Sequence, residues 1–138
     1  SLDGLLASKT YGKVFINLGL NEAGYDMGTM IGKYKALVDK VRAYQPNAKV
    51  ILQGIMMVGR GKSQEMDCFS LSHLWTINGK IQAMADNQNV FYIDVNYAFT
   101  DSEGYLPSEY SADGCHLYGK YTVLWADWIA HAVAQLGL

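Results

Sequence analysis

Three short apolar runs, each followed by a helical pattern, constrain the fold of this chain most strongly. The runs extend over Lys13 to Leu18, Lys49 to Val58 and Val90 to Val95. Nearly continuous apolar runs of this length are typical of strands that are buried on both faces. Apolar residues at helical spacing follow each run, at Met30 to Val41, Leu74 to Met84 and Tyr121 to Leu136. This alternation predicts an α/β fold with a parallel sheet covered by helices, because right-handed crossovers return the chain to the same sheet.

The predicted sheet is smaller than usual. Only three strands are visible, whereas a sheet usually has about five. Leu2 to Lys9 has the character of the end of another crossover helix. We therefore expect two N-terminal strands to lie outside this sequence, and residues 1–138 to form the C-terminal part of a single domain. Pro46 is expected to end the first long helix and Ser72 to cap the second.

Composition excludes several classes of partner. The 138 residues carry a formal net charge of −2, so no basic excess attracts nucleic acid or an anionic membrane surface. No apolar run reaches the roughly 20 residues that cross a bilayer. Small neutral or polar substrates fit this charge balance better, and nothing in the composition fixes the compartment. The two cysteines, Cys68 and Cys115, are expected to pack as small apolar side chains.

The loop after the first predicted strand contains Gly19, Asn21 and Glu22. Ligands of open α/β sheets bind beyond the carboxyl ends of the strands, where this loop lies. Glycine permits a tight turn there, and the asparagine amide can donate to an oxyanion. A turn or helix-capping role for Asn21 is the alternative, and this motif alone favours that alternative.

The loop before the last predicted helix places Asp113 and His116 three residues apart, with Gly114 and Cys115 between them. A carboxylate bonded to one ring nitrogen of an imidazole fixes its tautomer and stabilises its cation, as a general base requires. An aspartate cap beside a structural histidine explains the spacing equally well. A metal site is less favoured, because His73 and His131 lie in or beside helical patterns and supply no clear third ligand.

The segment from Gly59 to Ser63 ends in the Gly-Lys-Ser of a phosphate-binding loop. The first glycine of that motif would stand at position 56, where the chain has Met56. Without it the backbone amides cannot readily surround a phosphate, so Arg60 and Lys62 are interpreted as solvated charges at the rim.

Gly19-Leu20-Asn21-Glu22 and Asp113-Gly114-Cys115-His116 together resemble two sequence blocks of the SGNH hydrolases, also called GDSL lipases or acylhydrolases. The first resembles Gly-x-Asn-Asp with a final Glu, and the second resembles Asp-x-x-His in full. The stretch before His116 is also similar to bacterial members. The resemblance implies a three-layer α/β/α, flavodoxin-like fold and hydrolysis of a carboxylic ester without metal or organic cofactor. Asp113 would orient His116, His116 would activate a serine, and Asn21 with Gly19 would form the oxyanion hole.

The Gly-Asp-Ser block that carries the nucleophile in that family is not found in this sequence. None of the serines has that context, and the nucleophile is therefore expected outside this chain, which alone should be nearly inert. The serines are Ser1, Ser8, Ser63, Ser70, Ser72, Ser102, Ser108 and Ser111. The expected substrate is a small ester, either an acylated lipid or an acylated sugar. The alternatives are a non-catalytic binding or assembly module that self-associates through an exposed sheet edge, and, less favoured, a phosphate-binding protein.

Overall fold

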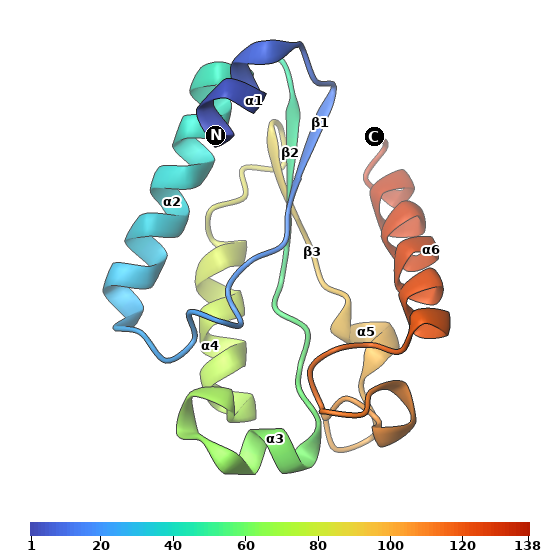
Figure 1. Cartoon of the computed structure of the whole chain (residues 1–138). Helices are drawn as coiled ribbons and strands as arrows, with labels where there is room; N and C mark the ends of the chain where they lie inside the picture. Colours follow the sequence, from blue (N-terminus) through green and yellow to red (C-terminus); the bar gives the residue numbers. More distant parts are fainter.

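The computed structural model describes all residues from 1 to 138. The sheet lies between two layers of helices, with α2 and α4 along one face and α6 along the other (Figure 1). The elements are α1 (Leu2–Ser8), β1 (Lys13–Ile16), α2 (Met27–Tyr44), β2 (Lys49–Gln53), α3 (Arg60–Glu65), the 3-10 turn η1 (Asp67–Phe69), α4 (Leu71–Gln82), β3 (Val90–Ile93), α5 (Asn96–Phe99), the 3-10 turn η2 (Ser108–Tyr110) and α6 (Gly119–Gln135).

All strand pairs are parallel, and the strand order is β1-β2-β3. Val14 is opposite Val50, and Val50 is opposite Val90. The central strand β2 is therefore paired on both sides, whereas β1 has a strand on one side only. The predicted α/β class, parallel sheet and three-layer arrangement are confirmed.

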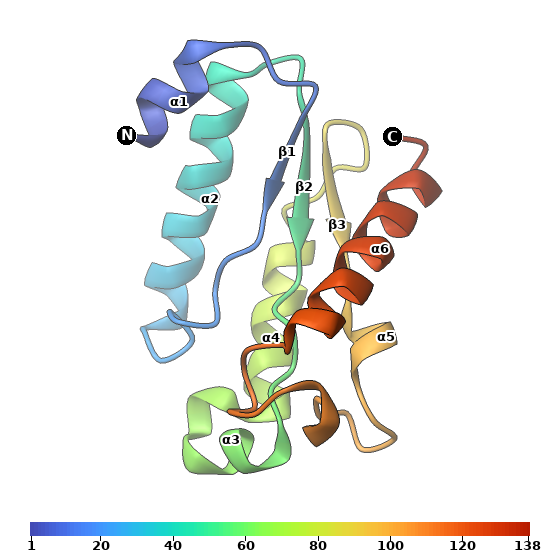
Figure 2. The same cartoon turned by 45° about the vertical axis from the view of Figure 1, so that its right-hand side comes forward.

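The period of two along the strands divides the core between the two faces of the sheet. Val50 and Leu52 of β2 and Val90 of β3 join the main core cluster, which also contains residues of α2 and α4. A smaller cluster around Val95 and Phe99 lies against α6, which crosses the other face of the sheet (Figure 2). Both layers of helices are thus held by apolar burial, and the carboxyl ends of all three strands point to one edge.

The second strand is shorter than the sequence predicts. The apolar run to Val58 is largely buried, but β2 ends at Gln53, and of residues 54–58 only Gly54 still donates its N–H to β3, at the carbonyl of Ile93. Two buried asparagine side chains, Asn78 and Asn96, bond to the backbone of Ile55 in this segment. The predicted end of the strand was wrong because apolar residues indicate burial, but they do not indicate whether a strand or a side chain forms the hydrogen bonds of the backbone N–H and C=O groups.

Two details of the helices also differ from expectation. Ser70, rather than Ser72, caps α4, because its hydroxyl accepts from the backbone N–H of His73. Leu124, within the apolar stripe predicted from Tyr121 to Leu136, is 46% exposed on α6. Pro46 follows the end of α2 at Tyr44, as predicted. No helix combines the length and apolar character needed to cross a bilayer.

Candidate active site

The loop from Ser111 to Leu117 brings Asp113 and His116 into direct contact. Oδ2 of Asp113 lies 2.6 Å from Nδ1 of His116. Oδ1 of the same carboxylate accepts from the backbone N–H groups of Cys115 and His116, both at 2.8 Å, and from the hydroxyl of Ser111 at 3.0 Å. The carboxylate therefore binds the loop and the imidazole at once. It does not cap α6, which begins at Gly119.

The same bonds stabilise the ionised form of Asp113. The backbone N–H of His116, then the His116 ring and the backbone N–H of Cys115, hold the pKa of this carboxyl well below its ordinary value of 3.8. An ionised carboxylate beside Nδ1 favours the tautomer with the proton on Nδ1, which leaves the lone pair of Nε2 free. The side chain of His116 is 87% exposed, so Nε2 is open to a ligand.

The loop after β1 turns tightly at Gly19, whose φ is +128°. The backbone conformation therefore favours glycine, and a Cβ atom at this position would also lie 2.9 Å from Cδ1 of Ile55, whose side chain would have to shift. The backbone N–H of Glu22 donates to the carbonyl of Gly19 at 3.2 Å and closes the turn. Asn21 is exposed in this turn and caps no helix, because α2 is capped by Asp26.

Gly19, Asn21 and His116 line one cavity of about 460 Å³ at the carboxyl ends of the strands. Asp113 does not line the cavity itself, but it contacts the ring of His116. The lining comes from three segments, namely 17–22 after β1, 53–56 at the end of β2, and 115–125 at the start of α6. The residues selected from the sequence therefore meet at one site. In this arrangement His116 can accept or release a proton at Nε2, and the amide of Asn21 can donate a hydrogen bond in the same cavity.

Several lining residues were not selected from the sequence. Trp125 belongs to the apolar stripe of α6, and it lines this cavity as well as meeting the ring of Phe15 edge to face, with the ring centroids 6.4 Å apart. Gln53, a polar residue at the end of a buried apolar run, is the sequence signal that could have indicated this wall of the cavity. Thr122 also lines the cavity. Burial raises the pKa of the Cys115 thiol, which disfavours the thiolate and agrees with its assignment as a packing residue.

The Gly59 to Ser63 segment does not form an open loop. Most of it lies in helix α3, and the N–H of Gly59 donates to the carbonyl of Gly114 at 2.8 Å. The hydroxyl of Ser63 donates to a backbone carbonyl at 2.9 Å. Arg60 and Lys62 form ion pairs with Glu103 and Glu65. These partners occupy the groups that a phosphate would need, so the geometry does not favour phosphate binding.

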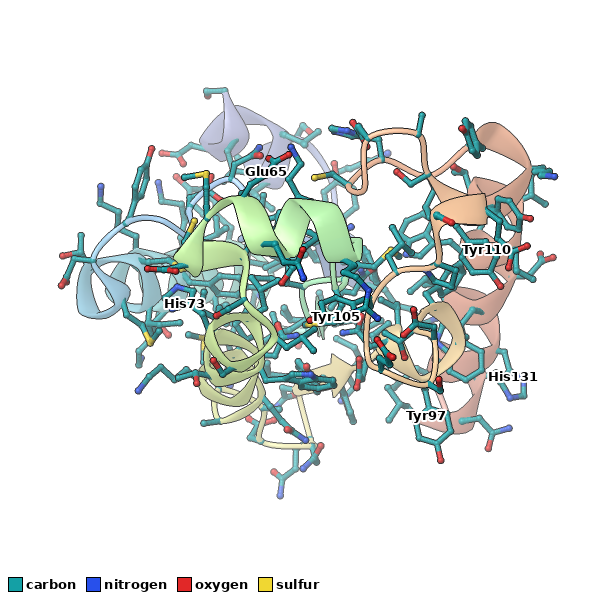
Figure 3. All side chains as sticks on the ribbon, turned by 90° about the horizontal axis from the view of Figure 1, so that it is seen from below. Glu65, His73, Tyr97, Tyr105, Tyr110 and His131 are labelled. Carbon is teal, nitrogen blue, oxygen red and sulfur yellow. The ribbon has the colours of Figure 1, made fainter.

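The other two histidines lie away from this cavity. Nε2 of His73 is 2.8 Å from the carbonyl oxygen of Ala23, whereas His131 is exposed on α6, on the side of the molecule opposite His73 (Figure 3). No group of three or more His, Cys, Asp and Glu side chains is close enough together to hold a metal ion.

Comparison with known proteins gives the family. Residues 3–120 match the sequence profile of the GDSL-like lipase/acylhydrolase family. The chain belongs to this family. The resemblance to GDSL hydrolases seen in the sequence is thereby confirmed. No curated protein matches the sequence significantly.

Solved structures similar to this GDSL-like chain support the same fold. One is a Streptococcus pneumoniae protein named for platelet activating factor, with 24% identity and a TM-score of 0.70 over 84% of this chain and 60% of that chain. Another is a GDSL-like lipase from Bacteroides thetaiotaomicron, with 20% identity and a TM-score of 0.71 over 90% of this chain and 62% of that chain. The chain thus spans about three fifths of the length of these proteins.

A second cavity, which we call the edge groove, runs along the unpaired side of β1 in this GDSL-like chain. It has a volume of about 640 Å³, and 11 of its 13 lining residues are hydrophobic. Phe15 and Leu18 are exposed beside it, at 37% and 48%. The edge groove and the first cavity share Asn17, Leu18 and Trp125. The sheet edge next to the candidate site is therefore apolar and uncovered.

Proposed function

We propose that this chain supplies the acid and the base of a carboxylic ester hydrolase, and that the serine nucleophile comes from outside residues 1–138. The observation that carries the proposal is the 2.6 Å contact between Asp113 and His116, with His116 lining the same cavity as Asn21. Membership of the GDSL-like lipase/acylhydrolase family supports it.

In the first half of the reaction, the serine oxygen attacks the ester carbonyl carbon. The serine proton moves to Nε2 of His116, and the carbonyl π electrons move to oxygen and form an oxyanion. Asp113 stabilises the imidazolium through Nδ1. When the tetrahedral intermediate collapses, the carbon–oxygen bond to the alcohol breaks, and His116 returns its proton to the leaving alkoxide. Water then repeats these steps on the acyl-enzyme and releases the acid.

Asn21 is the proposed oxyanion donor. It follows the tight turn at Gly19, so its amide lies at the edge of the cavity. A donor fixed in advance toward the oxyanion lowers the barrier because no group has to reorganise as charge develops. This reaction moves only protons and acyl groups, so it requires no metal or organic cofactor.

The nucleophile is the missing part. No serine lines the cavity. The hydroxyl of Ser111, the serine nearest in sequence to the pair, already donates to Asp113 and accepts from the N–H of Gly114 at 3.0 Å. The edge groove beside β1 would accept an additional strand that places a serine next to His116.

The test uses the product of the complete gene and p-nitrophenyl acetate. We expect hydrolysis that His116→Ala reduces by at least about a thousandfold. His131→Ala is the matched control, because this histidine lies outside both cavities, and it should leave the rate unchanged. Equal rates in the two variants, or no hydrolysis in the unchanged protein, would reject the proposal.

A second candidate function is assembly through the edge groove. An apolar, unpaired strand edge favours pairing with another chain, and the groove along β1 has this character. Self-association would appear as a dimer in light scattering that Phe15→Lys dissociates. A monomer at high protein concentration would exclude self-association through this edge.

A further inference from the structure

A buried carboxamide lies at the floor of the candidate active site. Gln53 is the last residue of β2 and is 1% exposed, next to the fully apolar Val50, Ile51 and Leu52. An apolar side chain would fill this position without the cost of removing an amide from water. The amide at this position therefore indicates a role other than packing.

The hydrogen bonds of Gln53 are only half satisfied within the chain. Nε1 of Trp125 donates to its Oε1 at 3.2 Å, which fixes the orientation of the carboxamide. Since the indole N–H can only donate, the acceptor oxygen must face it and the NH₂ group must face away. That NH₂ group has no hydrogen-bond partner in the protein, although the side chain lines the cavity that contains His116. Two donor hydrogens are thus available to a ligand.

Seven of the 14 residues that line the cavity are hydrophobic, and the polar side chains among the rest, apart from Glu22 and His116, are amides and a hydroxyl. Asn17, Asn21 and Thr122 line the same cavity, and so does the ring of Trp125. No lysine or arginine lines it, and Glu22 adds a carboxylate. A phosphorylated or otherwise anionic group would find no cation here and would meet a negative charge. Amide and hydroxyl groups beside an indole ring instead match a ligand with hydroxyl groups and an apolar ring face.

We propose that Gln53 and Trp125 form a sugar-binding subsite of this cavity, and that the substrate is a neutral O-acylated carbohydrate. The carboxamide of Gln53 donates to a hydroxyl oxygen of the sugar, and Trp125 both orients Gln53 and offers its ring to the sugar face. This inference rests on the proposed hydrolase function for the reaction, but the subsite itself is testable by binding alone.

The test follows the complete gene product in ¹H–¹⁵N NMR spectra. The probes are methyl 6-O-acetyl-α-D-glucopyranoside and hexyl acetate, which share the acetyl ester and differ in the alcohol. We expect the sugar ester to shift the side-chain amide of Gln53 and the indole N–H of Trp125. Gln53→Met, which keeps the length and removes the donors, should raise the Kd of the sugar ester about tenfold. Gln135→Met changes an exposed glutamine on α6 and should leave that Kd unchanged.

Two results would overturn the subsite. One is the absence of any shift at the Gln53 amide in the unchanged chain at millimolar sugar ester, a result that does not depend on whether the variant folds. The other is tighter binding of hexyl acetate than of the sugar ester. If the complete gene product hydrolyses esters while sugar binding is indifferent to Gln53→Met, the hydrolase stands and the subsite fails. If sugar binding depends on Gln53 but no ester is hydrolysed, the subsite stands and the hydrolase fails.

Discussion

Two buried asparagines hold the backbone that forms one wall of the candidate site, and their removal gives a quantitative prediction. Asn78 of α4 accepts from the N–H of Ile55 at 2.6 Å and donates to its carbonyl at 2.9 Å. Asn96 of α5 accepts from the N–H of Met57 at 2.7 Å and donates to the same Ile55 carbonyl at 2.9 Å. The Ile55 carbonyl is therefore shared, whereas each N–H has a single asparagine partner.

This sharing predicts a double-mutant cycle that is not additive. Asn78→Ala leaves the Ile55 N–H buried without a partner, and Asn96→Ala does the same to Met57, because both residues are almost fully buried. An orphaned buried donor costs about 1–3 kcal/mol, and a favourable change in helix propensity offsets about 0.5 kcal/mol of it. We expect each single variant to lose about 2 kcal/mol in free energy of unfolding. The double variant also orphans the Ile55 carbonyl, so its loss should exceed the sum by about 1 kcal/mol.

Urea unfolding followed by tryptophan fluorescence measures these free energies. Asn47→Ala is the matched control, because Asn47 is exposed, and it should change stability by less than about 0.5 kcal/mol. Strict additivity in the double variant would show that the two side chains do not share the Ile55 carbonyl. A loss in Asn78→Ala no larger than in the control would refute the account of this wall.

Three further predictions concern single positions. Gly19→Ala should destabilise the chain by about 1–3 kcal/mol, because alanine is strained at φ +128° and its Cβ would meet Ile55; a stability unchanged in urea unfolding would contradict this. Tyr34→Phe should keep or raise the melting temperature, because the Tyr34 hydroxyl is buried without a partner and burial raises its pKa to about 12; a large loss would mean that the hydroxyl is bonded. Asp113 has a depressed pKa in the folded chain, so its stabilising effect is present above its ordinary value of 3.8 and is lost as the pH falls toward the folded value. Asp113→Asn should therefore lose less free energy of unfolding between about pH 4 and pH 2 than the unchanged chain does; identical acid unfolding curves for the two would refute the assigned bonds.

The layers of the fold followed from periodicity. Apolar runs and helical stripes predicted all three strands and the helices α2, α4 and α6, because each of these elements buries a face at its own period. The same signal could not show where β2 ends. The partners of Ile55 and Met57 in this segment are side chains of Asn78 and Asn96, far along the chain, and only the assembled fold brings them there.

The candidate site was predictable where neighbours in sequence make the contact. The spacing of Asp113 and His116 allowed the pair that the structure shows, and the carboxyl-end rule placed Gly19 and Asn21 beside it. The predicted stripe from Tyr121 to Leu136 did not indicate that Trp125 lines a cavity, because a helical stripe does not reveal whether the facing space is filled. Its position between two cavities depends on the uncovered edge of β1, which is a property of the whole sheet. The catalytic roles of these residues remain predictions.

The measurement that tests the central claim most directly is labelling of the complete gene product with a fluorophosphonate, followed by mass spectrometry of the labelled peptide. The reagent modifies a serine only when a base activates its hydroxyl. We predict one labelled serine, located outside residues 1–138, and loss of the label in His116→Ala but not in His131→Ala. A label on a serine within residues 1–138, or labelling that persists in His116→Ala, would contradict the account.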